Sequence, residues 1–129
     1  DNYWAVNNNV IMENIPVVND AKSLSGTFVI PQNETFTKLI PDADLATTNR
    51  YAHVTYNFSN MSNDHLPSLS LNQADHFTVN INPCDSGLKA LNLGYIISND
   101  EIISPCTSEI FVYSMREDSL LKTFVYEVR

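Results

Sequence analysis

The chain has 129 residues, of which 43% are hydrophobic, and it carries 15 acidic against 7 basic side chains. A chain of this length suits one domain, so we expect a single domain over residues 1–129. The net charge of −8 repels phosphate backbones and anionic lipid surfaces, which argues against a nucleic-acid partner. The sequence also contains no apolar run of the length that a membrane-spanning helix needs.

The short motifs of the common enzyme classes are absent. Gly26, Gly87 and Gly94 are the only glycines, and their spacing cannot form a phosphate-binding loop. The strings H-E-x-x-H, C-x-x-C and G-x-S-x-G do not occur either. We therefore expect a protein that is not an enzyme and that holds no cofactor.

The two cysteines, Cys84 and Cys106, each lie beside a proline, and the segment between them has the length of one β-hairpin. This placement predicts a disulfide, which is typical of exported proteins. The start at Asp1, without a methionine, is compatible with a mature exported chain and equally with a trimmed one. We expect a secreted, periplasmic or cell-surface protein, with two reduced cysteines in a cytosolic protein as the alternative.

Strands are indicated along most of the chain by apolar residues that alternate with polar ones. In chain order the candidates are residues 3–6, 10–18, 24–30, 50–58, 66–71, 76–82, 91–98, 110–115 and 120–128. The clearest is 76–82, where Phe77, Val79 and Ile81 share one side. The last two candidates flank a polar turn and predict a hairpin.

Helix is scarce in this pattern. The best window is 42–48, which follows Pro41, and residues 88–91 are an alternative short helix. Turns rich in Asn and Asp recur at intervals of about ten residues. These features predict an all-β, single-domain antiparallel β-sandwich of about eight strands, either immunoglobulin-like or jelly-roll-like, with a closed β-barrel as the alternative.

Histidine supplies the first candidate site. His53 and His76 lie on the polar sides of two predicted strands, so they converge if those strands are neighbours, with Asp64, His65 or Asp75 available to complete a metal site. We nevertheless expect solvated histidines and no bound metal, because Asp75 and His76 are adjacent on a strand and point to opposite faces. For catalysis, His53 and His76 are the only residues worth testing, since the close carboxylate pairs all fall in predicted turns.

Aromatic residues supply the second candidate site. Tyr3, Trp4 and Tyr51 are the proposed ligand-binding residues, because such side chains stack on sugars or anchor protein partners. Tyr3 and Trp4 are adjacent, so they face opposite sides of a strand. The alternative places Trp4 at the centre of the core and leaves Tyr3 as a surface aromatic.

These observations predict a non-enzymatic, exported protein-binding or assembly module of the envelope, adhesin, toxin-accessory or inhibitor type. The edge strands of a sandwich accept or donate strands, and the segments 10–18 and 120–128 offer apolar strand material. A protein partner is favoured over a glycan. A lectin-like carbohydrate-binding domain and a small hydrolase with an unrecognised site are the two alternative functions.

Overall fold

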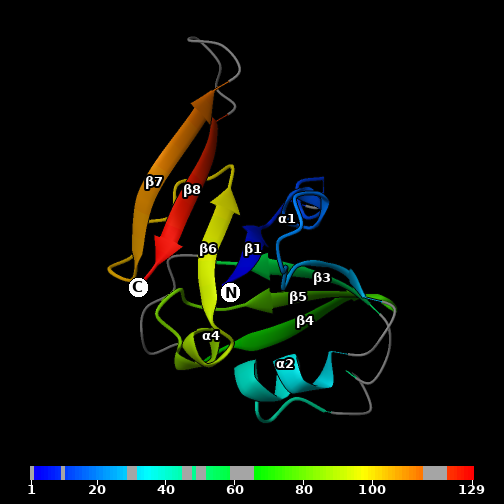
Figure 1. Cartoon of the computed structure of the whole chain (residues 1–129). Coiled ribbons are helices and arrows are strands. Elements are labelled where there is room, and N and C mark those ends of the chain that lie inside the picture. The colour runs from blue at the N-terminus through cyan, green and yellow to red at the C-terminus, as the bar shows by residue number, and fades with distance from the viewer. Residues whose placement is uncertain are drawn as a thin grey trace.

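Figure 1 shows the computed structural model of the chain, which describes residues 2–9, 11–28, 32–44, 48, 52–58, 66–114 and 122–129. The strands are β1 (Tyr3–Asn7), β2 (Gly26–Phe28), β3 (Ala52–Asn57), β4 (Ser68–Gln73), β5 (His76–Asn80), β6 (Leu93–Ser98), β7 (Thr107–Ser114) and β8 (Lys122–Val128). The described helices are α1 (Ile15–Val18), α2 (Asn33–Leu39) and α4 (Ser86–Ala90).

All eight strands belong to one mixed sheet, in the order β4-β5-β3-β1-β6-β8-β7, with β2 paired to β3. Strand β1 runs parallel to both β3 and β6, and β3 runs parallel to β5, whereas the other pairs are antiparallel. The terminal strands β4 and β7 do not pair with each other within the described residues. The all-β class is therefore confirmed, whereas an antiparallel sandwich and a closed barrel are not.

Strand β6, which runs parallel to β1, is buried on both faces. In β6, Ile96 and Ile97 are successive residues on opposite faces, and they are only 0% and 5% exposed. Strands with both faces covered are typical of parallel pairs. The strand predicted over residues 91–98 is present as β6, but apolar residues do not alternate with polar ones in its burial, because residues on both faces are buried.

The segment predicted as a strand over residues 10–18 does not form one. Residues 11–14 make a turn and Ile15–Val18 form α1, with Pro16 in the first helical turn. Proline is well placed there because its missing N–H would have no partner within the helix. The described residues of this segment, 11–18, do not pair with a strand. They lie against the sheet, because Glu13 contacts His53 and Pro16 lines a pocket together with Trp4.

Other elements match the sequence patterns to varying degrees. The C-terminal hairpin is present as β7 paired with β8, and the short helix foreseen at residues 88–91 is present as α4. Helix α2, whose first turn holds Glu34 and whose last holds Lys38, was not predicted. Parts of the helix predicted at 42–48 and of the strand predicted at 24–30 lie outside the described residues.

The two faces of the sheet have different roles. The core face carries residues such as Ala5, Val54 and Phe77, against which buried side chains of α2 and α4 pack. The opposite face, which we call the outer face, carries Val6 and His53. Cross-strand partners share a face, so the pairing register assigns side chains to one face or the other along each strand.

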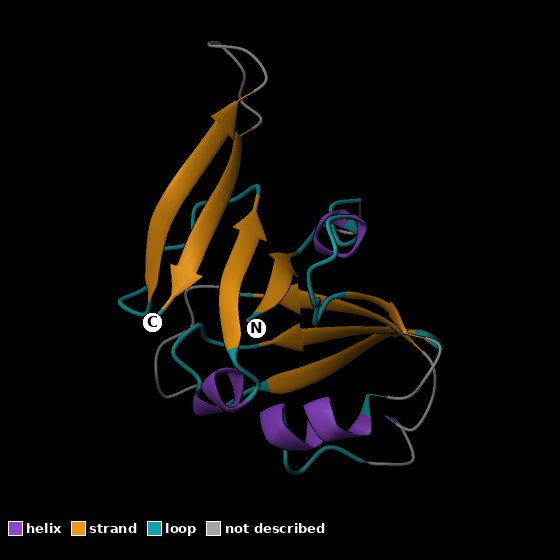
Figure 2. Ribbon diagram, in the orientation of Figure 1, coloured by secondary structure: helices purple, strands orange, loops and turns teal. Residues whose placement is uncertain are grey.

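The sheet is strongly twisted, so β3, β4 and β5 cross the direction of β6, β7 and β8 (Figure 2). Helices α2 and α4 lie at one end of the molecule, and the β7–β8 hairpin projects from the other end (Figure 1). Within the described residues, no helix combines the length and apolar character that crossing a membrane requires.

Candidate functional site

The two candidate histidines meet on the outer face. His53 of β3 is the direct cross-strand partner of His76 of β5. Their ring centroids lie 4.9 Å apart in an edge-to-face arrangement. The expectation that these side chains converge when their strands are neighbours is therefore met, whereas His65 and Asp64 lie outside the described residues.

A third member of this cluster was not foreseen from the sequence. Glu13, in the turn before α1, reaches over the outer face, and its Oε2 contacts His53 Nε2. The side chain of Glu13 is 1% exposed and that of His53 is 26% exposed. The pair thus combines a buried carboxyl group with an imidazole that solvent reaches.

Burial raises the pKa of the Glu13 carboxyl above its ordinary value. Desolvation is the largest cause, and it is opposed by contacts with Thr55 and His53 and by the more distant charge of His76. A buried carboxyl group with a raised pKa beside histidines is typical of functional sites. Among the described residues, we therefore take the cluster of Glu13, His53 and His76 as the leading candidate for a site of acid–base chemistry.

Each histidine also contacts a threonine hydroxyl. His53 Nδ1 lies 3.2 Å from Thr27 Oγ1 on β2, and His76 Nε2 lies 2.9 Å from Thr55 Oγ1. Thr27 is exposed, whereas Thr55 is 3% exposed. Of these two threonines, Thr27 is therefore the one that solvent reaches.

A pocket of about 270 Å³ lies beside the histidines and is lined by His53, Gln73, Asp75 and His76. Across the described part of the chain, no group of three His, Cys, Asp or Glu side chains is arranged to hold a metal ion. At His53, Glu13 faces one ring nitrogen and Thr27 faces the other.

The other half of the outer face is apolar. One row of successive cross-strand partners runs across four strands here, and it consists of Val6, Ile97, Val125 and Phe111. Helix α1 covers the inner end of this row, where an apolar pocket of about 220 Å³ opens. This pocket is lined by Trp4, Ile15, Pro16, Asn19, Ala21 and Ile97. At the other end of the row, Phe111 is 57% exposed.

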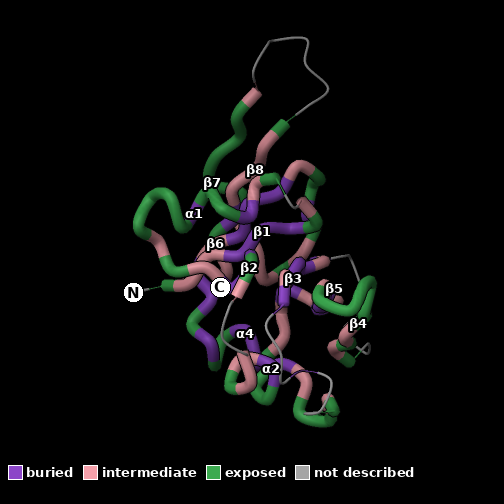
Figure 3. Tube along the Cα trace, turned by 90° about the vertical axis from the view of Figure 1, so that its right-hand side faces the viewer, coloured by how far each residue is buried: buried purple, intermediate pink, exposed green. Residues whose placement is uncertain are grey.

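Strand β7 exposes four large apolar side chains in succession. These are Ile110, Phe111, Val112 and Tyr113, which are between 40% and 57% exposed. A register shift occurs between Glu109 and Phe111, so Ile110 is the extra residue of a bulge. Phe111 and Val112 then lie on opposite faces, and the tube in Figure 3 is green, and thus exposed, along much of this strand.

The predicted aromatic site is only partly described. Trp4 stacks on Tyr95 of β6, with ring centroids 4.5 Å apart, on the outer face. Tyr3 is half-buried against the core, and Lys22 Nζ lies 5.8 Å from its ring centroid. The alternative that placed Trp4 at the centre of the core and Tyr3 on the surface was wrong. Tyr51 lies outside the described residues, so the three residues are not seen together.

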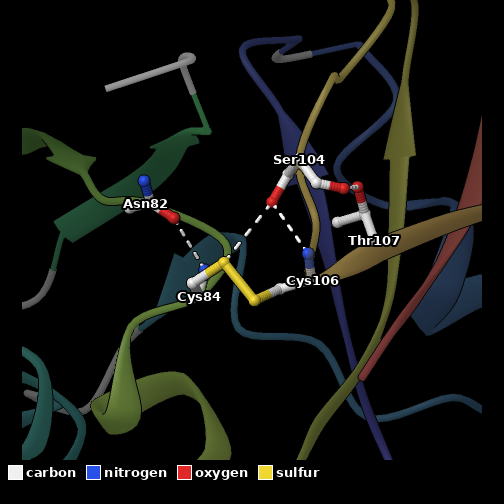
Figure 4. Close-up of a disulfide and its surroundings, with 5 residues drawn as sticks. All are labelled: Asn82, Cys84, Ser104, Cys106 and Thr107. Atoms are coloured by element: carbon white, nitrogen blue, oxygen red, sulfur yellow. Dashed lines mark hydrogen bonds between the residues drawn. A yellow bond between two sulfur atoms is a disulfide. The ribbon is translucent and has the colours of Figure 1, made fainter. Parts of the chain in front are cut away.

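The predicted cysteine pair is present at disulfide distance. Cys84 and Cys106 are joined with their Cα atoms 5.2 Å apart (Figure 4). Ser104 Oγ lies 3.6 Å from Cys84 Sγ and accepts a hydrogen bond from the Cys106 backbone N–H. The disulfide ties the segment before α4 to the start of β7. It therefore anchors the base of the projecting hairpin.

The family described as a domain of unknown function, DUF7654, matches residues 1–129. No curated protein and no solved structure matches the chain.

Proposed function

The chain belongs to the DUF7654 family, a domain of unknown function, and we propose that it is an exported, non-enzymatic module that binds or assembles with another protein. The observation that carries this proposal is the run of exposed apolar side chains Ile110–Tyr113 on β7. Large exposed apolar patches on proteins typically mark interaction sites.

The position of β7 adds to this argument. The strand lies at the end of the sheet, and no other described strand pairs with its outer edge. An edge of this kind offers main-chain donors and acceptors to an added strand. Natural edge strands are commonly protected by charged residues, but β7 contains only one, Glu109.

We propose that the occupant of this edge is an extended, apolar segment of a different protein. Main-chain pairing supplies affinity, and apolar side chains of the segment cover Phe111 and Tyr113 on one face and Val112 on the other. A basic residue in the segment complements Glu109. A second copy of this chain is disfavoured, because each copy carries a net charge of −8 and like charges repel.

Affinity capture from the source organism tests the proposal, with the size of each complex measured by light scattering. The chain is compared with the double variant Phe111→Asp, Tyr113→Asp. A matched control is Ile103→Asp, which changes a side chain that is 71% exposed in the loop before β7. We expect a defined complex that the double variant loses and the control keeps.

Three outcomes would overturn the proposal. The first is a partner that binds the double variant and the unchanged chain equally well. The second is a chain that stays monomeric and captures nothing. The third is specific binding on a glycan array that Trp4→Ala abolishes with the fold intact, because this would favour the carbohydrate-binding alternative.

A further inference from the structure

The outer face holds three side chains in the order carboxyl, imidazole and hydroxyl. Glu13 Oε2 contacts His53 Nε2, and His53 Nδ1 lies 3.2 Å from Thr27 Oγ1. A hydroxyl within hydrogen-bond reach of a base that a third group orients is the arrangement that activates nucleophiles. We propose that Thr27 is a nucleophilic site that accepts acyl groups from carboxylic esters, a covalent function beyond strand binding.

The contacts at His53 determine which nitrogen acts as the base. A carboxylate only accepts hydrogen bonds, so the ionised form of Glu13 favours the tautomer of a neutral His53 in which the Nε2 atom that faces Glu13 carries the proton. Nδ1 then has a free lone pair, which accepts the Thr27 hydroxyl proton. Glu13 is thus a positioning residue, because it fixes the tautomer without touching the reacting atoms.

The exposure of the three groups increases in the order that the chemistry requires. Glu13 is 1% exposed, His53 is 26% exposed at its side chain, and Thr27 is exposed. A buried carboxylate holds the imidazole in a low-dielectric setting, whereas an external ester reaches the hydroxyl directly. The neighbouring pair of Thr55 and His76 lacks this access, because Thr55 is 3% exposed.

The proposed step is a balanced acyl transfer. A bond forms between Thr27 Oγ and the ester carbonyl carbon while His53 Nδ1 takes the hydroxyl proton. The tetrahedral intermediate then collapses and the bond to the leaving oxygen breaks. His53 returns the proton to that oxygen, so an alcohol leaves. We expect the acyl group to remain on the protein, because the branched carbon of threonine hinders attack by water.

The experiment uses the full chain and p-nitrophenyl acetate. The release of p-nitrophenol is followed by absorbance, and the site of acetylation is found by tandem mass spectrometry. We expect an adduct on Thr27, its absence in Thr27→Val, and its recovery in Thr27→Ser. His53→Gln should slow labelling roughly 100-fold, the scale of a lost general base. Thr37 is the internal control, since it is an exposed threonine whose hydroxyl donates to the Asn33 carbonyl.

The role of Glu13 has its own readout. In nitrogen-15 NMR spectra we expect the Nε2-protonated tautomer of His53, and a mixture of tautomers in Glu13→Gln. Circular dichroism identifies variants that lose the fold. Labelling of Thr27 that is no faster than labelling of Thr37, or that persists in His53→Gln, would overturn the inference. Continuous turnover that depends on Thr27 would support the nucleophile and overturn the non-enzymatic role proposed above.

Discussion

Burial of Glu13 disfavours the ionised form of its carboxyl group. Its folded pKa is raised above the ordinary value of 4.5, chiefly by desolvation. A carboxyl group of this kind contributes stability below its unfolded pKa, where it is protonated in both states. That contribution is lost as the pH rises through the folded pKa.

Glu13→Gln tests this directly, because glutamine stays neutral at every pH. We expect the free energy of unfolding of the unchanged chain, relative to the variant, to fall as the pH rises above 4.5 and then to level off. Each unit of pKa difference is worth about 1.4 kcal/mol. Urea unfolding at a series of pH values measures this. A relative gain in stability with rising pH would mean that the contact with His53 outweighs desolvation.

Two buried tyrosines provide a matched comparison. The Tyr56 hydroxyl is buried with no hydrogen-bond partner among the described residues, and burial raises its pKa. The Tyr126 hydroxyl accepts a hydrogen bond of 3.0 Å from the Ile102 backbone N–H. An unpaired buried polar group is destabilising, whereas a paired one contributes about 1 kcal/mol.

We therefore expect Tyr56→Phe to leave stability unchanged or to raise it. Tyr126→Phe should lower the free energy of unfolding by about 1–3 kcal/mol, because the Ile102 N–H loses its partner. Denaturant unfolding of both variants provides the measurement. Equal losses in the two variants would show that the Tyr56 hydroxyl has a partner in solution.

For single residues, the sequence placed His53 and His76 on the polar sides of two strands, so that they would meet only if those strands were neighbours. The pairing of β3 with β5 supplies that condition. The sequence could not predict Glu13, which is 40 positions from His53 in the printed sequence. A lone acidic residue inside the apolar run 10–18 was the only available signal. Nothing local indicates that this run folds across the sheet.

Among the elements, the β7–β8 hairpin is held at its base by the disulfide between Cys84 and Cys106. Cys84 and Cys106 are 22 positions apart, and closing a loop of this size is worth about 3 kcal/mol in the chain-entropy account. We expect no titratable thiol in the denatured, unreduced protein, and a loss of about 3 kcal/mol on reduction. If two free thiols were titrated, the disulfide would be absent and most of the argument for export would be lost.

The elements that the sequence predicted best are those with a local signal. The alternating residues of β5 and the turn-flanked hairpin strands are examples. The strand predicted over residues 10–18 was wrong because apolar residues of this kind suit a strand and a short helix equally. Pro16 suits the first turn of the helix that forms there. The strand predicted over residues 91–98 is present as β6, although both of its faces are buried and its burial does not alternate.

At the scale of the whole molecule, metal binding provides a simple test. Across the described residues no three ligands converge, and both ring nitrogens of His53 face protein groups. We expect zinc or copper at neutral pH to raise the melting temperature by no more than about one degree, since such stabilisation requires tight binding to the folded state. A larger shift would contradict this, and substitutions of His53 and His76 would locate the site.

Sheet order was beyond the reach of sequence reasoning. Strand β1 lies between β3 and β6, which are distant from it in the chain, and both contacts are parallel. Such pairings depend on long-range packing and carry no turn signal. The sequence showed that the C-terminal strands are apolar, but it did not show that β8 lies inside the sheet and β7 at its edge.

The proposed function depends above all on a partner protein that adds a strand to β7. Hydrogen exchange of the backbone amides tests it most directly, measured residue by residue in the free chain and in the captured complex. We expect the complex to slow exchange in β7, Thr107–Ser114, more than in any other described strand. Slowed exchange confined to β4, or to the residues around the Trp4 pocket, with β7 unchanged, would contradict it.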